Sequence, residues 1–130
     1  MSFGMQMRFP CEIVIWYLLP AIRSALAKEL AGLGLSQKEI SEKLGISEAA
    51  VSQYMKGKRG GKIDFSTELN EMVREAARHI ASSVSIIDVY RKTCNLCLSL
   101  RKKALMCDLH RKMDNVPEDC NLCPCLSEDL

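Results

Sequence analysis

One stretch constrains the fold more than any other, the 25 residues SQKEISEKLGISEAAVSQYMKGKRG at positions 36–60. It predicts two short helices joined by a tight turn. Ser36 and Glu39 have the spacing of a capping box, in which each side chain accepts a hydrogen bond from the other residue's backbone N–H. Gly45 follows the first helix, where a left-handed backbone is needed and glycine adopts it without steric cost. Ser47 is a favourable N-cap for the second helix.

The apolar residues of this stretch recur at helical spacing and predict one buried face on each helix. They are Ile40, Leu44, Ile46, Val51, Tyr54 and Met55. Ser41 is small and is expected at the point where the two helices cross most closely. Because two short helices cannot bury these faces alone, a third packing element is required. A turn of this length presents the second helix outward, in a position that suits the major groove of DNA.

The segment resembles the helix-turn-helix of Cro- and repressor-type transcription regulators, the lambda-repressor-like class; the alternative is an ordinary helical hairpin. The resemblance implies that Gln37, Lys56 and Lys58 lie beside DNA phosphates. Gln53 is the expected base reader, since its amide can make two hydrogen bonds to adenine. The predicted DNA-binding residues are Gln37, Ser47, Glu48, Ala49, Ser52, Gln53, Lys56, Lys58 and Arg59.

The distribution of charge supports this interpretation. The formal net charge of the chain is only +2, so the protein is not a polycation. Basic residues nevertheless follow the second helix closely, at Lys56, Lys58, Arg59 and Lys62. A local basic patch beside a helix-turn-helix is what contact with phosphates requires.

The residues before this motif predict the third helix that it needs. Cys11 to Leu19 is apolar nearly all round, so we expect it to be buried or to meet another chain. Pro20 should kink or restart the helix, because it lacks a backbone donor and crowds the preceding turn. The helix then continues to Gly32 and Gly34, with one apolar face formed by Ile22, Leu26, Leu30 and Leu33.

A longer helix is predicted after the motif, from about Thr67 to the mid-eighties. Its apolar face comprises Leu69, Met72, Val73, Ala76, Ile80 and Val84, and we expect His79 at the surface. The sequence thus predicts an all-α protein in three parts. These are a helix-turn-helix domain at 1–62, a connecting or dimerisation helix at 63–88, and a small cysteine-rich domain at 89–130.

Cysteine usage sets the second half apart. Of seven cysteines, Cys11 lies in the apolar first helix, where we expect a core residue. Two C-x-x-C pairs lie within about thirty residues of each other, a spacing that lets paired thiolates bind one metal ion or cluster. The predicted metal ligands are Cys94, Cys97, Cys107, Cys120 and Cys123, with Cys125 as a possible substitute.

The identity of the metal is left open by the residues. An iron–sulfur cluster of the 4Fe-4S type is favoured, because the cysteines outnumber what one zinc ion needs and the glycines of a zinc ribbon are missing. Zinc is the alternative, held by Cys94, Cys97, Cys120 and Cys123, or with Cys107 and His110 as one ligand pair. A thiol switch without metal is the third reading.

The whole order of elements resembles archaeal helix-turn-helix regulators with a cysteine-rich C-terminal domain. The resemblance implies a homodimer that binds a palindromic operator in double-stranded DNA and uses the cysteine domain as a sensor. Candidate dimer surfaces are Ile13–Leu19 and Leu69–Val84. The alternatives are a regulator with a purely structural zinc site and, from another class, a thiol or cluster redox enzyme.

An enzyme is not expected, because the sequence around Cys94 lacks the strand-to-helix junction of C-x-x-C oxidoreductases. The longest apolar run, Ile13 to Leu19, is far too short to span a bilayer, and no signal peptide is recognisable at the first residues. We therefore expect a cytoplasmic protein without membrane contact.

Overall fold

The computed structural model describes residues 9–57, 67–102 and 110–112, and all regular structure in these ranges is helical. The elements in chain order are α1 (Pro10–Ile13), the π-helical segment η1 (Val14–Leu18), α2 (Leu19–Gly32), α3 (Gln37–Leu44), α4 (Glu48–Met55), α5 (Thr67–Ser82) and α6 (Ile86–Lys102). The predicted all-α class is confirmed for this part of the chain. None of the described helices has both the length and the apolar character that crossing a bilayer requires.

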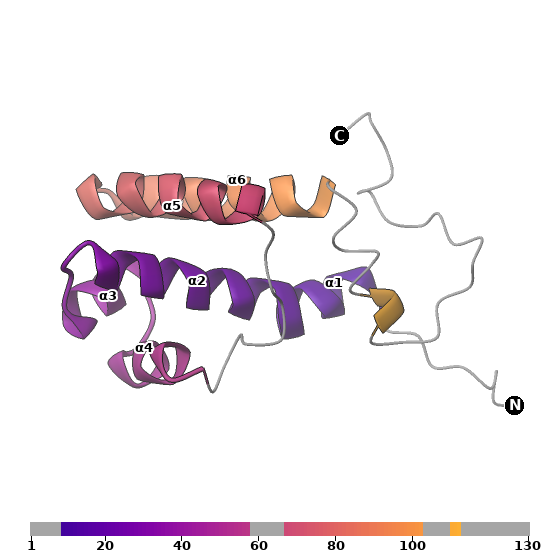
Figure 1. Ribbon diagram of the computed structural model, residues 1–130, viewed down its shortest axis with the longest axis horizontal. Helices are drawn as coiled ribbons and strands as arrows, with labels where there is room; N and C mark the ends of the chain where they lie inside the picture. Colours follow the sequence, from indigo (N-terminus) through magenta and orange to yellow (C-terminus); the bar gives the residue numbers. More distant parts are fainter. Residues whose placement is uncertain (1–8, 58–66, 103–109, 113–130) are drawn as a thin grey trace, which may run out of the picture.

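The helices are arranged around α2. In Figure 1, α5 and α6 lie side by side along one side of the continuous rod formed by α1, η1 and α2. The two short helices α3 and α4 lie on the other side of α2 and pack against each other and against it. This layout leaves α3 and α4 at the outside of the molecule.

The first helical rod is not interrupted at Pro20 but widened just before it. The Leu19 N–H donates to the carbonyl of Val14, five residues earlier, and Pro20 occupies the first turn of α2. A proline crowds the carbonyl four residues before it in a regular α-helix, and a π-turn is one of the ways in which a helix accommodates such a mismatch. The helix therefore does not restart at Pro20 as one of the two predicted outcomes had it; it accommodates the proline by a π-turn at Val14–Leu18 that leads directly into α2.

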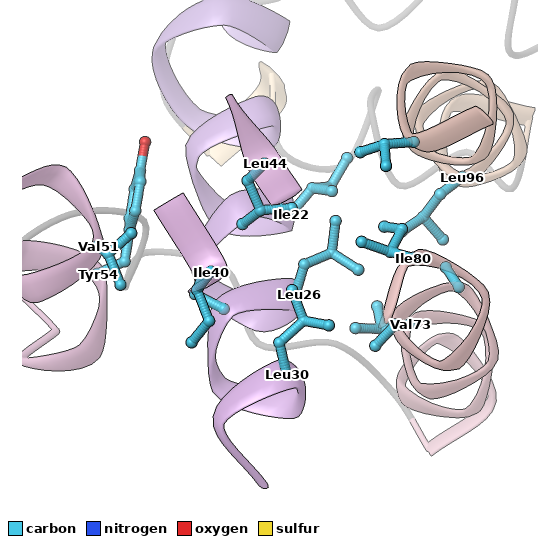
Figure 2. Packing of buried hydrophobic residues seen from close by; sticks show 14 of the residues in the cluster. Ile22, Leu26, Leu30, Ile40, Leu44, Val51, Tyr54, Val73, Ile80 and Leu96 are labelled. Atoms are coloured by element: carbon cyan, nitrogen blue, oxygen red, sulfur yellow. The ribbon is translucent and has the colours of Figure 1, made fainter. Parts of the chain in front are cut away.

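Residues of α2 form the centre of the hydrophobic core and contact the short helices on one side and α5 on the other. Ile22, Leu26 and Leu30 are completely buried. Figure 2 shows them between Ile40, Leu44, Val51 and Tyr54 of the two short helices and Val73 and Ile80 of α5. Helix α6 adds Val89, Leu96 and Leu100 to the same cluster. One continuous core therefore joins the first half of the chain to the helix that carries Cys94 and Cys97.

Two residues predicted for apolar helix faces lie outside the core. Leu33 is 49% exposed, because α2 ends at Gly32 and the chain turns away through Gly34 at a φ of 98°. Val84 is fully exposed, because α5 ends at Ser82. Hydroxyls of Ser82 and Ser83 donate to the carbonyl of His79. Such side-chain bonds compete with the helical hydrogen bonds and favour the end of a helix.

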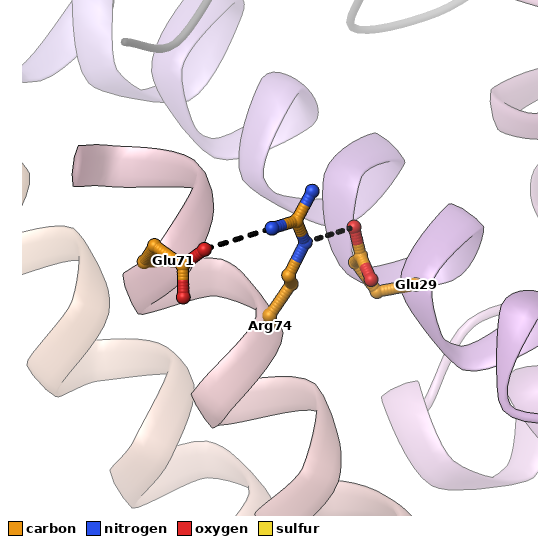
Figure 3. Close-up of polar contacts among 3 residues, drawn as sticks. All are labelled: Glu29, Glu71 and Arg74. Atoms are coloured by element: carbon orange, nitrogen blue, oxygen red, sulfur yellow. Dashed lines mark hydrogen bonds and ion pairs between the residues drawn. The ribbon is translucent and has the colours of Figure 1, made fainter. Parts of the chain in front are cut away.

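A polar contact at the surface joins α5 to α2. Arg74 Nε lies 3.5 Å from Glu29 Oε1, and Arg74 Nη1 donates to Glu71 Oε1 at 2.8 Å (Figure 3). The side chains of Arg74 and Glu29 are 47% and 38% exposed, so solvent screens the attraction and the contribution to stability is small. The apolar contacts of α2 hold α5 in place, and this ion pair only adds to them.

Candidate nucleic-acid interface

The turn between α3 and α4 is built as the sequence predicts. Ser36 Oγ accepts from the Glu39 backbone N–H at 3.1 Å, and Glu39 Oε1 accepts from the Ser36 backbone N–H at 3.0 Å. Gly45 ends α3 in the left-handed region at φ 68° and ψ 34°. Ser47 Oγ accepts from the Ala50 backbone N–H at 3.1 Å and caps α4. These local predictions are confirmed, and together they fix the direction in which α4 leaves the turn.

Helix α4 is held from behind by its apolar side and by a polar contact near its end. Val51 and Tyr54 are buried, as predicted, and Ala50 is buried beside them. The Ser24 hydroxyl of α2 donates to the Tyr54 carbonyl at 3.3 Å in a buried position. Sequence reasoning missed Ser24, since no local pattern distinguishes this serine from one on a helix surface. The same carbonyl accepts the Gly57 backbone N–H at 3.1 Å, so the Ser24 hydroxyl adds a second hydrogen bond at the end of α4.

The predicted DNA-binding residues within the described ranges are exposed or half-buried. Gln37 is exposed at the first position of α3, and Ser47, Glu48 and Ala49 are exposed where α4 begins. Ser52 and Gln53 follow on α4 and are half-buried, and Lys56 is exposed just after its end. Lys58 and Arg59 lie outside the described residues.

The exposed side of α4 offers mixed chemistry. Gln53 carries an amide that can both donate and accept, Ser52 a hydroxyl, and Ala49 a methyl group suited to contact with thymine. Glu48 carries a negative charge, so it repels phosphates but can accept a hydrogen bond from the amino group of cytosine. Lys56 supplies a positive charge where the helix ends. Side chains of this kind can distinguish base edges as well as contact the backbone.

Comparison with known protein families agrees with this geometry. Residues 26–60 match the family described as Helix-turn-helix, a range that runs from the middle of α2 to just beyond α4. No curated protein and no solved structure gives a match.

The matched part of the chain is therefore a helix-turn-helix domain of the lambda Cro and repressor type. Domains of this class are the DNA-binding modules of transcription regulators.

The predicted cysteine ligands are described only in part. Cys94 and Cys97 lie one turn apart on α6, Cys94 exposed and Cys97 half-buried against the core. Cys107, Cys120, Cys123 and Cys125 lie outside the described residues, as does the side chain of Cys11. Among the side chains that the structure describes, no group of three or more His, Cys, Asp or Glu is placed to hold a metal ion. His110 is described and is buried.

One of the predicted domain boundaries, between residues 88 and 89, falls inside α6. The cysteine-rich part was predicted to start at residue 89, and α6 runs from Ile86 to Lys102. Its apolar residues pack on α5 and on the common core. Helix packing therefore places Cys94 and Cys97 on a helix that belongs to the common core. The division into three domains stays a prediction.

The capping box has an electrostatic consequence at the start of α3. The hydrogen bond from the Ser36 backbone N–H lowers the pKa of the Glu39 carboxyl from its ordinary value of 4.5, with help from the Ser36 hydroxyl and the charge of Lys43. A carboxyl whose pKa is lower in the folded state stabilises the fold above its unfolded pKa. That stabilisation is lost as the pH falls through the folded pKa.

We therefore predict that Glu39→Gln reduces the acid sensitivity of the fold. Glutamine keeps an acceptor for the Ser36 N–H but cannot be protonated in this range. Thermal unfolding followed by circular dichroism between about pH 7 and about pH 3 should show a smaller fall in melting temperature for the variant than for the unsubstituted protein. Glu42→Gln is the control, since it removes an exposed carboxylate from the same helix without touching the cap. An equal fall in all three proteins would contradict the assignment.

Proposed function

We propose that the protein is a transcription regulator that binds double-stranded DNA by inserting α4 into the major groove. One observation carries the proposal, the way in which α4 is fixed from behind while its N-terminal half faces outward. Val51, Tyr54 and the bond from Ser24 hold the helix at fixed orientation. A reading helix must be rigid, because its side chains have to meet base edges within tenths of an ångström. Binding to DNA implies a cytoplasmic site of action.

The proposed contacts divide into two groups. The first group contacts base edges from the outward side of α4 and comprises Gln53, Ser52, Ala49 and Glu48, with Ser47 at the start of the helix. Phosphates are contacted by Gln37 and Lys56, and by Lys58 and Arg59 further along the chain. Phosphate contacts position the domain on the duplex, and base contacts choose the sequence.

We predict that Gln53→Ala weakens binding to the recognised sequence by about 1–3 kcal/mol and leaves binding to random DNA nearly unchanged. The lost amide contributes only where its matching base is present. The recognised duplex is first obtained by selection from a randomised library, and affinities are then measured by fluorescence anisotropy at several salt concentrations.

Lys56→Ala is the matched comparison on the same helix end. Its loss should weaken both duplexes alike and flatten the salt dependence, because a phosphate contact does not depend on sequence. If Gln53→Ala weakens both duplexes equally, Gln53 is not a base reader. If no sequence is enriched from the library, the regulator proposal fails.

The proposal includes a homodimer on a palindromic operator. One helix-turn-helix reads only a few base pairs, so two half-sites about one helical turn apart are expected. Of the two predicted surfaces, α5 turns its apolar residues Val73, Ala76 and Ile80 into the core. The first surface leaves Ile15 and Trp16 exposed on η1, at 62% and 69%. Exposed large apolar side chains next to each other favour this segment for contact with a second copy.

We predict that Trp16→Glu converts the dimer to a monomer, because a buried charge in the contact has no partner. Light scattering after size-exclusion chromatography at micromolar concentration measures the change. Leu98→Glu is the control, an exposed apolar residue on α6 with the same change of charge. A monomeric unsubstituted protein, or dissociation by Leu98→Glu alone, would contradict the proposed surface.

We further propose that a cysteine-ligated iron–sulfur cluster modulates operator binding, as a sensor of redox state, iron or sulfur. Support comes from the two thiols on α6 and the four further cysteines within 94–125. Cys94 and Cys97 face one side of a helix, because side chains three positions apart are neighbours there. Thiolates of this kind fit two ligands of a 4Fe-4S cluster, with Cys107, Cys120 and Cys123 as the remaining candidates and Cys125 as a substitute. A structural zinc site is the alternative.

The iron–sulfur and zinc alternatives predict different absorption spectra of the purified protein, and gel shifts then test whether the cysteines regulate DNA binding. A broad absorption band near about 400 nm in anaerobically purified protein is the expected result for an iron–sulfur cluster. A colourless protein containing zinc would support the alternative. Gel shifts on the selected duplex should then differ between intact protein, air-exposed protein and Cys97→Ser. Equal affinity of all three would show that the cysteines do not regulate binding.

A further inference from the structure

Helix α6 makes direct contact with the turn of the helix-turn-helix. The hydroxyl oxygen of Tyr90 lies 3.0 Å from the position that a Cβ on Gly45 would occupy, and Cε1 and Cζ of the same ring lie 3.8 Å from it. The tyrosine therefore rests on the bare backbone of Gly45. Any other residue at position 45 would strain the left-handed backbone, and its Cβ would press tightly against the Tyr90 hydroxyl.

A second contact between the same parts lies next to the first. The Lys43 ammonium of α3 donates to the carbonyl of Ser83, in the connection between α5 and α6. Beside it is a groove of about 280 Å³ between α3 and the start of α6, lined by Glu39, Glu42, Ile86 and Val89 among others. Around this groove the two parts meet at separate points and not over a continuous packed surface.

The contact lies at the position in the chain that sets the orientation of α4. Gly45 is the residue at which the chain changes direction between α3 and α4. The backbone N–H groups of Gly45 and Ile46 both donate to the carbonyl of Ser41, and Ser47 caps α4 immediately afterwards. A small change in the backbone angles of Gly45 therefore rotates α4 as a whole against α3.

We propose that Tyr90 is a positioning residue for the DNA-reading helix, which couples the position of α6 to the angle of α4. Tyr90, Cys94 and Cys97 lie on successive turns of α6, and a helix carries a displacement along its axis as a rigid element. A change in the chemical state of the thiols that moves α6 also moves the tyrosine on Gly45. The regulatory part of this inference rests on the proposed DNA-binding function, whereas the contact itself does not.

The first experiment tests the contact without DNA. Amide hydrogen exchange at Gly45 and Ile46 is compared in the full chain and in Tyr90→Ala, Tyr90→Phe and Asn95→Ala. Tyr90→Ala should accelerate exchange at these amides by about tenfold, because the turn opens locally when the ring is removed. Tyr90→Phe removes only the hydroxyl, the Tyr90 atom nearest to Gly45, and should lose part of the protection. Asn95→Ala, an exposed α6 residue one turn further on, should match the unsubstituted protein.

Global unfolding separates this effect from a general loss of stability. Tyr90 is 53% exposed, so its removal should change the melting temperature little. Unchanged exchange in Tyr90→Ala would overturn the proposal. So would acceleration spread evenly over α2 and α5, since that result would mean that Tyr90 only stabilises the fold.

The second experiment tests the coupling from the thiols. Exchange at Ile46 is measured in the full chain and in Cys97→Ser, each with Tyr90 present and with Tyr90→Ala. The proposal expects Cys97→Ser to change exchange when Tyr90 is present and to leave it unchanged in the Tyr90→Ala background. No change in either background, or an equal change in both, would overturn the coupling.

DNA binding supplies the third comparison. On the selected duplex, Tyr90→Ala should lose about 5- to 20-fold in affinity with little change on random DNA, in the range of ordinary coupling between sites. A full chain that selects no duplex at all would refute the proposed function, and the exchange results would still decide the contact. A full chain that binds specifically while Tyr90→Ala binds equally well would refute the positioning role alone.

Discussion

The burial of α2 on both of its sides is the constraint on which the rest of the structure depends. Helices α3 and α4 have eight residues each, too few to be stable as isolated helices in water. Their order comes from packing against Ile22, Leu26 and Leu30, and the same residues hold α5 on the opposite side. Removing one such leucine side chain from a core of this kind costs about 2–5 kcal/mol, a large part of the stability of a small domain.

This arrangement places the helix-turn-helix and the cysteine-bearing helix α6 at different parts of the molecule. The outward surface of α3 and α4 is free for contact because α5 and α6 cover the other side of α2. Helix α6 nevertheless reaches the helix-turn-helix at its turn, through Tyr90 on Gly45 and through the link between Lys43 and Ser83. The cysteine-bearing helix thus touches the helix-turn-helix at the residue where the chain turns toward α4, and not at the proposed reading surface.

Local chemistry made the centre of the fold predictable. The capping box at Ser36 and Glu39 and the left-handed Gly45 depend on residues a few positions apart, and the structure contains both. Predictions that required knowledge of where helices end were weaker, since Val84 continues the periodicity of α5 although serine hydroxyls end that helix first. The contacts from Ser24 to Tyr54 and from Tyr90 to Gly45 join residues thirty or more positions apart. No single-sequence pattern encodes such pairs. The DNA contacts and the cysteine ligands remain predictions from residue type and spacing.

The energetic scale of the Tyr90 contact fits the proposed positioning role better than a role in stability. A half-exposed ring that rests on a glycine buries little apolar surface, so its loss leaves the core formed around α2 intact. Regulation requires only a small free-energy difference, because 1–3 kcal/mol changes an affinity by about 5- to 150-fold. A weak contact at a pivot can change the angle of the reading helix while the fold that supports the helix stays unchanged.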